Sequence, residues 1–264
     1  MTSTMPAKAR NNKTPMWQTL LAGAFWVAVW QGLAVCIGHN GLFLATPLQT
    51  VQTLWRLLPT ADFWHRVGFS ALRILTGFVL AVTVGLLLGA CGARWRWFGT
   101  LMGPVMQLIR AMPVASFVIL ALLWVSGKNL SVIVSFTHVL PVVYAGTVGG
   151  IADTDPALLE MAKVYRLPLG KRLRYIWLPG MFPSFCENCI AAMGMCWKSG
   201  VSAEVIGLPD HSVGDALYRA KITISTPEVF AWTLVIVLLS ATLSTLAAWA
   251  LRRAKRALCG EVEG

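Results

Sequence analysis

The chain alternates long apolar runs with short polar segments, and six of the apolar runs are about 20 residues long. A helix of about 20 apolar residues crosses a hydrocarbon core of about 30 Å, so each run predicts a transmembrane helix. The pattern therefore predicts an all-α membrane protein with about six transmembrane helices. We place the spans at residues 17–37, 69–92, 104–124, 131–151, 182–203 and 230–251.

One polar segment between two spans, residues 152–180, carries a pattern of its own and includes the stretch "LEMAKVYRLPLGKRLRYIWLP". Asp155 suits an N-cap and Pro156 suits the first helical position, so a short helix is expected to begin there. Pro168 and Gly170 end it, and a second short helix follows until Pro179 turns the chain toward the fifth span. A basic loop that only fixes the topology is the alternative, but the capped start and the two-helix pattern favour a compact structure.

Composition supports the membrane assignment, since 56% of the residues are apolar and only 12% are charged. The net charge of +11 would suit a nucleic-acid partner, but the basic residues fall between the apolar runs rather than on one solvated face. With a cytoplasmic N-terminus, 14 of the 22 Lys and Arg residues lie on the inner side and five on the outer side. The positive-inside rule thus predicts that both termini are cytoplasmic. The predicted parts are a tail (1–16), a transmembrane domain (17–251) and a second tail (252–264).

No motif in the sequence supports a catalytic function. There is no phosphate-binding G-x-x-x-x-G-K-[ST] loop, no H-E-x-x-H and no G-x-S-x-G, and the histidines are far apart. The motif "CENC" (186–189) lies with Cys196 on one helical face, but no fourth ligand is visible, so thiols packed between helices are the better interpretation. We expect no catalytic residue, no metal site and no cofactor in this chain, and energy supplied by another protein.

The loop resembles the corresponding loop in the transmembrane subunits of bacterial ABC importers. That family carries Glu-Ala-Ala, a Gly four residues after the second Ala, and Ile-x-Leu-Pro about ten residues later. Here the first triplet is Glu160, Met161 and Ala162, and Arg166 stands at the Gly position. The loop residues that the resemblance assigns to contact with the ATPase are Glu160, Met161, Ala162, Arg166, Ile176, Leu178 and Pro179.

The stretches 72–89, 108–127 and 197–209 also resemble this family, in particular its nitrate, sulfonate, taurine and thiamine-precursor group. The resemblance implies a type I importer fold in the bacterial inner membrane, with two copies of this permease subunit forming the pore. It further implies a cytosolic ATPase dimer that binds ATP and Mg, an extracytoplasmic solute-binding protein, and a coupling role for the 152–180 loop. Membrane lipid would surround the assembly.

Polar residues inside the predicted spans are the candidates for the solute pathway. Arg110 and Lys198 would each cost about 2.5–3.5 kcal/mol at a helix centre, so they should face a cavity or a partner rather than lipid. Pro113 is expected to bend the third span. A structural ion pair of Lys198 with Glu187 or Glu204 is the alternative to solute contact. The candidate pathway residues are Arg110, Pro113, Trp197, Lys198 and Glu204.

Two other classes remain open at this point, an ion-coupled secondary transporter and a membrane enzyme or assembly factor with a cytoplasmic basic loop. The second is the weaker alternative, because the sequence shows no catalytic constellation. An ion-coupled secondary transporter could also use intramembrane Glu and Lys, but such carriers usually show internal repeats, and none is evident here. Two buried cations per subunit suit a small organic anion or sulfonate, and the resemblance adds a vitamin precursor as the alternative solute.

Overall fold

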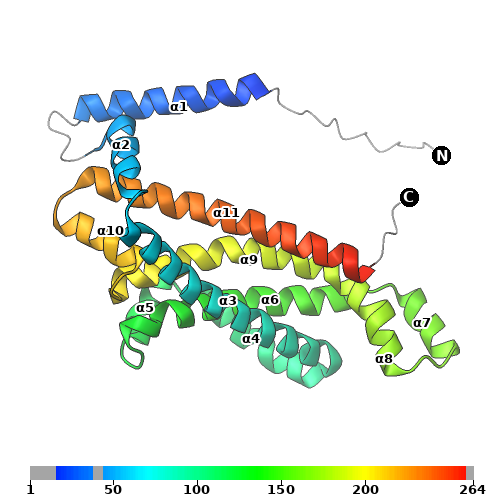
Figure 1. The fold of residues 1–264 in the computed structure, drawn as a ribbon. Helices are drawn as coiled ribbons and strands as arrows, with labels where there is room; N and C mark the ends of the chain where they lie inside the picture. The colour runs from blue at the N-terminus through cyan, green and yellow to red at the C-terminus, as the bar shows by residue number, and fades with distance from the viewer. Residues whose placement is uncertain (1–15, 38–43, 260–264) are drawn as a thin grey trace, which may run out of the picture.

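The computed structural model describes residues 16–37 and 44–259, and every regular element in these two stretches is helical (Figure 1). The N-terminal tail up to residue 15 and the last five residues of the C-terminal tail lie outside the described residues. The elements are α1 (Met16–Ile37), α2 (Pro47–Leu57), α3 (Ala61–Arg94), α4 (Arg96–Ala111), α5 (Val114–Ala121), α6 (Gly127–Ala152), α7 (Pro156–Val164), α8 (Leu169–Arg172), the π-helical turn η1 (Leu173–Trp177), α9 (Leu178–Gly207), α10 (Val213–Ile222) and α11 (Thr226–Cys259).

Four of the described helices, α1, α3, α6 and α11, are long and apolar enough to cross a membrane. The predicted third span is two helices, α4 and α5, which meet at an angle of 100°; counted as one broken span, they raise the number to five. The bend lies at Met112 and Pro113, as Pro113 led us to expect, because proline disfavours the helical conformation of the residue before it. The predicted fifth span is the 30-residue α9, which is not among these long apolar helices.

The centre of the bundle is the contact of α3 and α9 with α6. On α3, Gly77, Ala81, Gly85 and Gly89 follow one another at four-residue spacing, and all four are buried. A Cβ at Gly85 would stand 2.9 Å from Val143 Cβ on α6. Small residues at this spacing let two helices approach closely, which is a common way to pack helices in a membrane.

The remaining long helices lie on either side of this centre. Helix α11 packs along α9, where Trp197 Nε1 donates a hydrogen bond of 3.0 Å to the Ile236 carbonyl oxygen. Helix α1 stands away from the bundle, and its described side chains are almost all exposed (Figure 1). Its Trp30 reaches back to stack on Phe230 of α11 and to donate to the Ala45 carbonyl.

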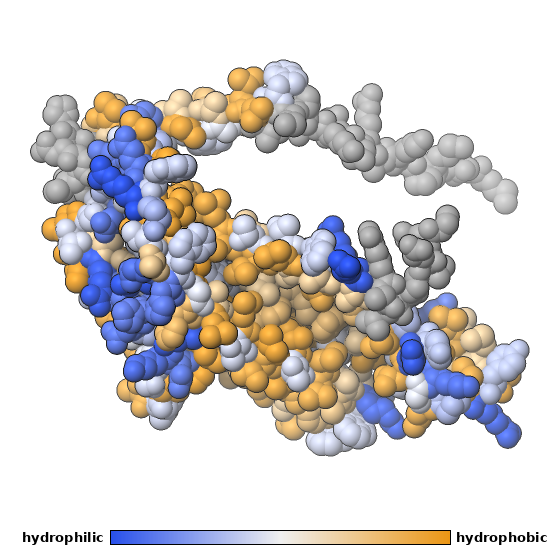
Figure 2. Space-filling view, viewed as in Figure 1, coloured by the Kyte–Doolittle hydropathy of each residue, from blue (hydrophilic) through white to orange (hydrophobic). Residues whose placement is uncertain are grey.

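The two ends of the bundle differ in structure. The short helices α2, α5 and α10 gather at one end, and α7 and α8 project from the other (Figure 1). Figure 2 shows apolar side chains over the middle of the long helices, with hydrophilic ones concentrated at the ends. We refer below to the α10 end and the α7 end.

Candidate functional site

The loop of residues 152–180 forms the projecting element at the α7 end. Helix α7 begins as the sequence predicts: Asp155 Oδ1 accepts a hydrogen bond of 2.9 Å from the Ala157 N–H, and Pro156 occupies the first turn. The cap satisfies one of the backbone donors that a helix start leaves unpaired. A second helical segment, α8 with η1, follows after the turn.

The turn between these helices lies at Arg166, the position where the resembling family has Gly. Arg166 has φ +48°, so it takes up the left-handed conformation itself. The Arg166 N–H donates to the Lys163 carbonyl at 3.1 Å, and the Leu167 N–H donates to the Ala162 carbonyl at 3.0 Å. These two bonds form a Schellman motif, in which Gly is usually found. The turn therefore keeps the family's position and is not displaced to Pro168 and Gly170.

Ala162 lies inside the loop rather than on its surface. Its side chain is fully buried, and its carbonyl also accepts a hydrogen bond of 3.0 Å from Arg172 Nη2 on α8. One carbonyl thus joins the turn and the second helix. The small side chain at this position serves the packing of the loop itself.

The second helix does not stop at Pro179, where we expected the chain to turn. Helix α8 leads through the π-turn η1 into α9, and Pro179 lies in the first turn of α9. At the end of η1 the N–H of Leu178, the first residue of α9, donates to the Leu173 carbonyl, five residues back. A π-turn inserts one residue into a helix without breaking it. The loop is therefore continuous with α9, and Ile176 is buried at this junction while Leu178 and Pro179 are half-buried.

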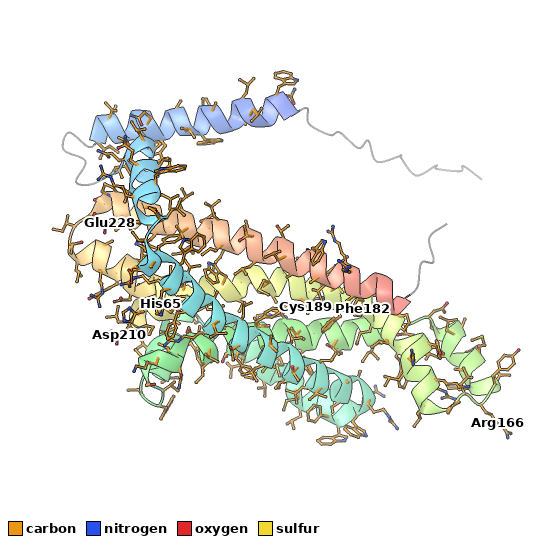
Figure 3. All side chains as sticks on the ribbon, viewed as in Figure 1. His65, Arg166, Phe182, Cys189, Asp210 and Glu228 are labelled. Carbon is orange, nitrogen blue, oxygen red and sulfur yellow. The ribbon has the colours of Figure 1, made fainter. Side chains whose placement is uncertain are left out.

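The outer face of the loop carries exposed side chains. Glu160 is exposed and forms no ion pair with another described residue, and Met161 is 44% exposed beside it. Arg166 points outward at the tip (Figure 3). Other large apolar side chains of the loop are exposed as well: Val164, Tyr165, Leu169 and Tyr175. Leu173 instead lines a cavity with Leu86 and Leu87 of α3. An apolar face with charges around it is typical of a protein contact surface.

Arg110 lies near the end of α4, just before the bend. Its Nη2 donates a hydrogen bond of 3.2 Å to the Pro141 carbonyl oxygen of α6. The side chain lines two cavities, of about 410 Å³ and about 400 Å³. The first, the Asn188 cavity, also involves His138 and Asn188; the second, the Tyr144 cavity, also involves Gln107 and Tyr144.

Three other candidate pathway residues lie away from these cavities. Trp197 is fully buried between α9 and α11. Glu204 is fully buried as well, and its Oε2 accepts hydrogen bonds from Ser70 Oγ at 2.7 Å and from the Gly214 N–H at 3.3 Å. Lys198 is exposed and forms no ion pair within residues 44–254, so the expected pair of Lys198 with Glu187 or Glu204 is absent there.

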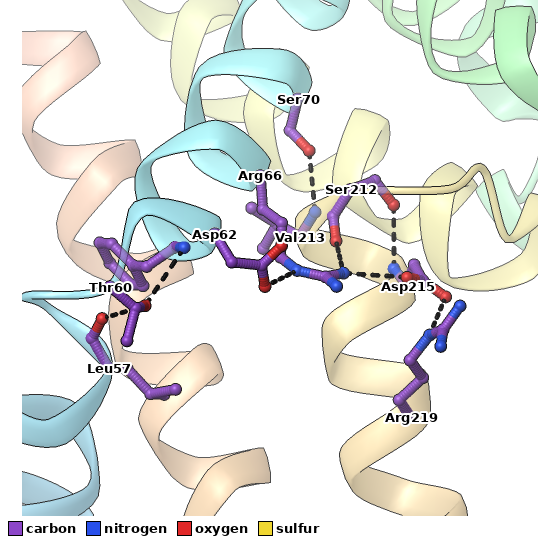
Figure 4. Close-up of polar contacts among 10 residues, drawn as sticks. Leu57, Thr60, Asp62, Arg66, Ser70, Ser212, Val213, Asp215 and Arg219 are labelled. Atoms are coloured by element: carbon purple, nitrogen blue, oxygen red, sulfur yellow. Dashed lines mark hydrogen bonds and ion pairs between the residues drawn. The ribbon is translucent and has the colours of Figure 1, made fainter.

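Sequence reasoning missed the partners of Glu204 and the network beside them. Ser70 Oγ also accepts from the Val213 N–H at 2.9 Å, and Arg66 of α3 forms an ion pair with Asp215 of α10 at 2.9 Å (Figure 4). Arg66 and Asp215 are 149 residues apart in sequence, so no local pattern links them. The network fixes α10 to the start of α3.

The cysteines of α9 take part in packing. Cys186, Cys189 and Cys196 are buried, and Cys196 Sγ lies 3.6 Å from the Ile74 carbonyl of α3. None of the three is in a disulfide. Thiols packed between helices are what the sequence predicted for this motif.

Comparison with known families decides the class of this protein. Residues 70–258 match the family model described as "Binding-protein-dependent transport system inner membrane component". The chain belongs to this family. It is therefore an inner-membrane permease component of an ABC importer, a multi-pass membrane protein whose family works with an ATPase and a solute-binding protein.

Individual relatives are distant but cover most of the chain. The permease protein SsuC of Escherichia coli, named for aliphatic sulfonates transport, is 28% identical over 82% of this chain and 84% of its own. The nitrate import permease protein NrtB of Synechococcus elongatus is 24% identical over 85% and 84% of the two chains. The taurine transport system permease protein TauC of Escherichia coli is 23% identical over 91% and 89%.

Among solved structures, a chain of an amino acid ABC transporter with histidines is similar, with a TM-score of 0.47 and 21% identity. The similarity covers 74% of this chain and 99% of that one.

Proposed function

We propose that this permease subunit forms the solute pathway of an ATP-driven importer as a homodimer, and that the 152–180 loop couples it to a separate cytosolic ATPase. The observation that carries the proposal is the continuity of the loop with α9 through η1. A displacement of the loop is then transmitted to the bundle without a flexible joint, as a two-state mechanical linkage requires. The partner ATPase would bind ATP and Mg.

The internal bonding of the loop supports this role. The Ala162 carbonyl holds both the turn and Arg172, so the two short helices move together. Glu160, Met161 and Arg166 lie on the exposed face, where a partner has access to them. A rigid core with an exposed apolar and charged face is the arrangement that a docking element needs.

Dimer formation is supported by surface that the single chain leaves open. Helix α1 is apolar around its circumference and exposed, and both cavities at Arg110 open to the outside of the chain. A second copy can cover the face with the cavities, whereas lipid can cover α1. The excess of basic residues at the α7 end supports placing that end, and both termini, in the cytoplasm.

The solute that we propose is a small organic anion such as a sulfonate. The names of three relatives refer to sulfonates, nitrate and taurine, and Arg110 places a positive charge at the cavities. A vitamin precursor would not require this cation.

Reconstitution tests the proposal. The purified permease is placed in proteoliposomes with the ATPase and binding protein encoded beside it, and uptake of ethanesulfonate, taurine and nitrate is measured with and without ATP. We expect uptake only when ATP, ATPase and binding protein are all present. Uptake driven by a proton or sodium gradient without ATPase would instead identify an ion-coupled carrier and refute the proposal.

A further inference from the structure

Arg110 is the single lining residue that the Asn188 cavity and the Tyr144 cavity share. Along α6 the first cavity involves His138 and the second extends to Gly149, so the first lies nearer the α10 end. Helix α4 gives the same order, because Gly103 of the second cavity lies farther toward the α7 end than Arg110. The two cavities therefore follow one another along the bundle, with Arg110 between them.

The Arg110 guanidinium has spare capacity for a ligand. Among the described residues it forms one hydrogen bond, from Nη2 to the Pro141 carbonyl, and no carboxylate within residues 44–254 forms an ion pair with it. A guanidinium has five N–H donors, so most of them are left for other acceptors. A carbonyl is a neutral acceptor, and an oxyanion forms a stronger, charge-assisted bond with the same group.

Other polar groups of the Asn188 cavity are fixed by their own helices. Asn188 Nδ2 donates to the Ser184 carbonyl at 2.8 Å, and His138 Nδ1 lies 3.0 Å from the Val134 carbonyl. The second amide hydrogen of Asn188 remains for an anion, whereas Nε2 of neutral His138 is an acceptor, because Nδ1 carries the hydrogen that faces the Val134 carbonyl. Gly146 of α6 makes room for Asn188, since a Cβ there would stand 2.8 Å from Asn188 Cγ.

The rest of this cavity is apolar. Its other lining residues are Ile109, Val142, Ala191 and Met195. A cation at one end, the fixed amide donor of Asn188 and an apolar wall match a small anion that carries an aliphatic part. Inorganic anions without such a part would leave the apolar wall uncovered.

We propose that Arg110 is an anion-selective gate, and that the Asn188 cavity is the subsite for a small aliphatic oxyanion of the sulfonate class. The oxyanion draws the guanidinium away from the Pro141 carbonyl and receives a second hydrogen bond from Asn188. The aliphatic part lies on Ala191 and Met195. When the guanidinium returns to Pro141, it separates the two cavities again. This inference rests on the proposed transport role and adds to it the residues and the solute chemistry.

Charged thiol reagents test the gate without the rest of the importer. Ala191→Cys places a thiol in the Asn188 cavity and Ala145→Cys places one in the Tyr144 cavity, and both positions are exposed. Cys36, Cys91 and Cys259 are first changed to Ser, and buried Cys186, Cys189 and Cys196 are kept. In nanodiscs, labelling rates are measured with 2-sulfonatoethyl methanethiosulfonate, itself a small sulfonate, and with its trimethylammonium counterpart.

The ratio of the two rates reports the local preference for an anion, and any change in thiol ionisation cancels from it. We expect Arg110→Gln to lower the anion-to-cation ratio at both positions by about fivefold or more, because one charge acts with opposite sign on the two reagents. Arg110→Lys should keep most of the preference. Lys128→Gln, which removes an exposed cation at the start of α6 outside both cavities, is the matched control and should leave the ratio unchanged.

An unchanged anion-to-cation ratio in Arg110→Gln, or an equal change in Lys128→Gln, would overturn the gate.

Asn188→Leu tests the subsite. It should lower the labelling rate of the sulfonate reagent at Ala191→Cys and leave the rate at Ala145→Cys unaffected. Equal changes at both positions would remove Asn188 from the subsite. Labelling needs neither ATPase nor binding protein, so a failure of the proposed coupling leaves these outcomes interpretable. Conversely, ATP-driven uptake together with an unchanged anion-to-cation labelling ratio in Arg110→Gln would refute the gate and leave the proposed function standing.

Discussion

Ser70 Oγ donates a hydrogen bond of 2.7 Å to Glu204 Oε2, and this contact joins α3 to the last turn of α9 in the protein interior. The same hydroxyl accepts from the Val213 N–H, so one side chain also holds the first turn of α10. Glu204 is fully buried, its Oε1 has no hydrogen-bond partner among the described residues, and Arg73 is the cation whose charge acts on it. The Ser70 hydroxyl of α3 therefore holds together α3, α9 and α10.

Ser70→Ala should lower stability by about 2–3 kcal/mol, because it leaves both the Val213 N–H and Glu204 Oε2 without the Ser70 partner inside the protein. The measurement is the midpoint of thermal unfolding in detergent. Thr76→Ala on the same helix is the control, since the Thr76 hydroxyl is exposed and bonds only to the Leu72 carbonyl of its own helix. Equal shifts for the two variants would show that the joint at Ser70 contributes little.

Gly89→Ala should destabilise the contact of α3 with α6 by about 1–3 kcal/mol, because the new Cβ would stand 2.6 Å from Thr147 Cβ and the helices would have to separate. Gly68→Ala is a matched control on the same helix: nothing lies within 4 Å of its Cβ, and Ala favours a helix over Gly by about 1 kcal/mol. The two Gly→Ala changes should therefore shift the unfolding midpoint in opposite directions. A stabilised Gly89→Ala protein would mean that the two helices are not packed at this point.

The apolar runs predicted most of the fold, because a membrane span must be a long apolar helix whatever packs against it. The loop was also predictable, since the cap at Asp155 is a local interaction that needs no tertiary information. Its continuation into α9 was not, because a π-turn keeps the helix going where Pro179 predicts a break. Sequence rules for proline describe regular α-helix and take no account of an inserted residue.

The candidate pathway residues could not be sorted by sequence. Helix α9 is apolar on most of its circumference, so the pattern does not show which side is the core. The sequence therefore made Trp197, Glu204 and Lys198 equal candidates for the solute pathway. In the structure Trp197 and Glu204 are buried, whereas Lys198 is exposed. Ser70 carried no signal at all, because its partners Glu204 and Val213 are more than 130 residues away in the chain.

Arg166→Gly should stabilise the 152–180 loop by about 0.5–1 kcal/mol. An L-residue in the left-handed region costs about 1–2 kcal/mol, which Gly avoids, although Gly loses more chain entropy on folding. Slower amide exchange at Arg166 and Leu167, whose N–H groups close the turn, would show the effect. Arg174→Gly is the control, because Arg174 lies in η1 and its φ is negative. Gly gains nothing there and costs chain entropy, so this variant should show faster amide exchange in the loop. Faster exchange in Arg166→Gly would contradict the interpretation of the turn.

Glu160→Lys should weaken the association of the permease with its ATPase at least tenfold while leaving insertion and unfolding temperature unchanged. Glu160 is exposed on α7 and bonds to no other described residue, so charge reversal changes the docking face and not the loop's own packing. Co-purification of the ATPase and ATP-driven uptake are the two measurements. Asp210→Lys makes the same charge change at the α10 end, where Figure 3 places Asp210, and should leave ATPase association as in the unmodified protein. If Glu160→Lys co-purifies with the ATPase as well as Asp210→Lys does, the exposed face of α7 is not the contact, and docking must lie elsewhere on the α7 end.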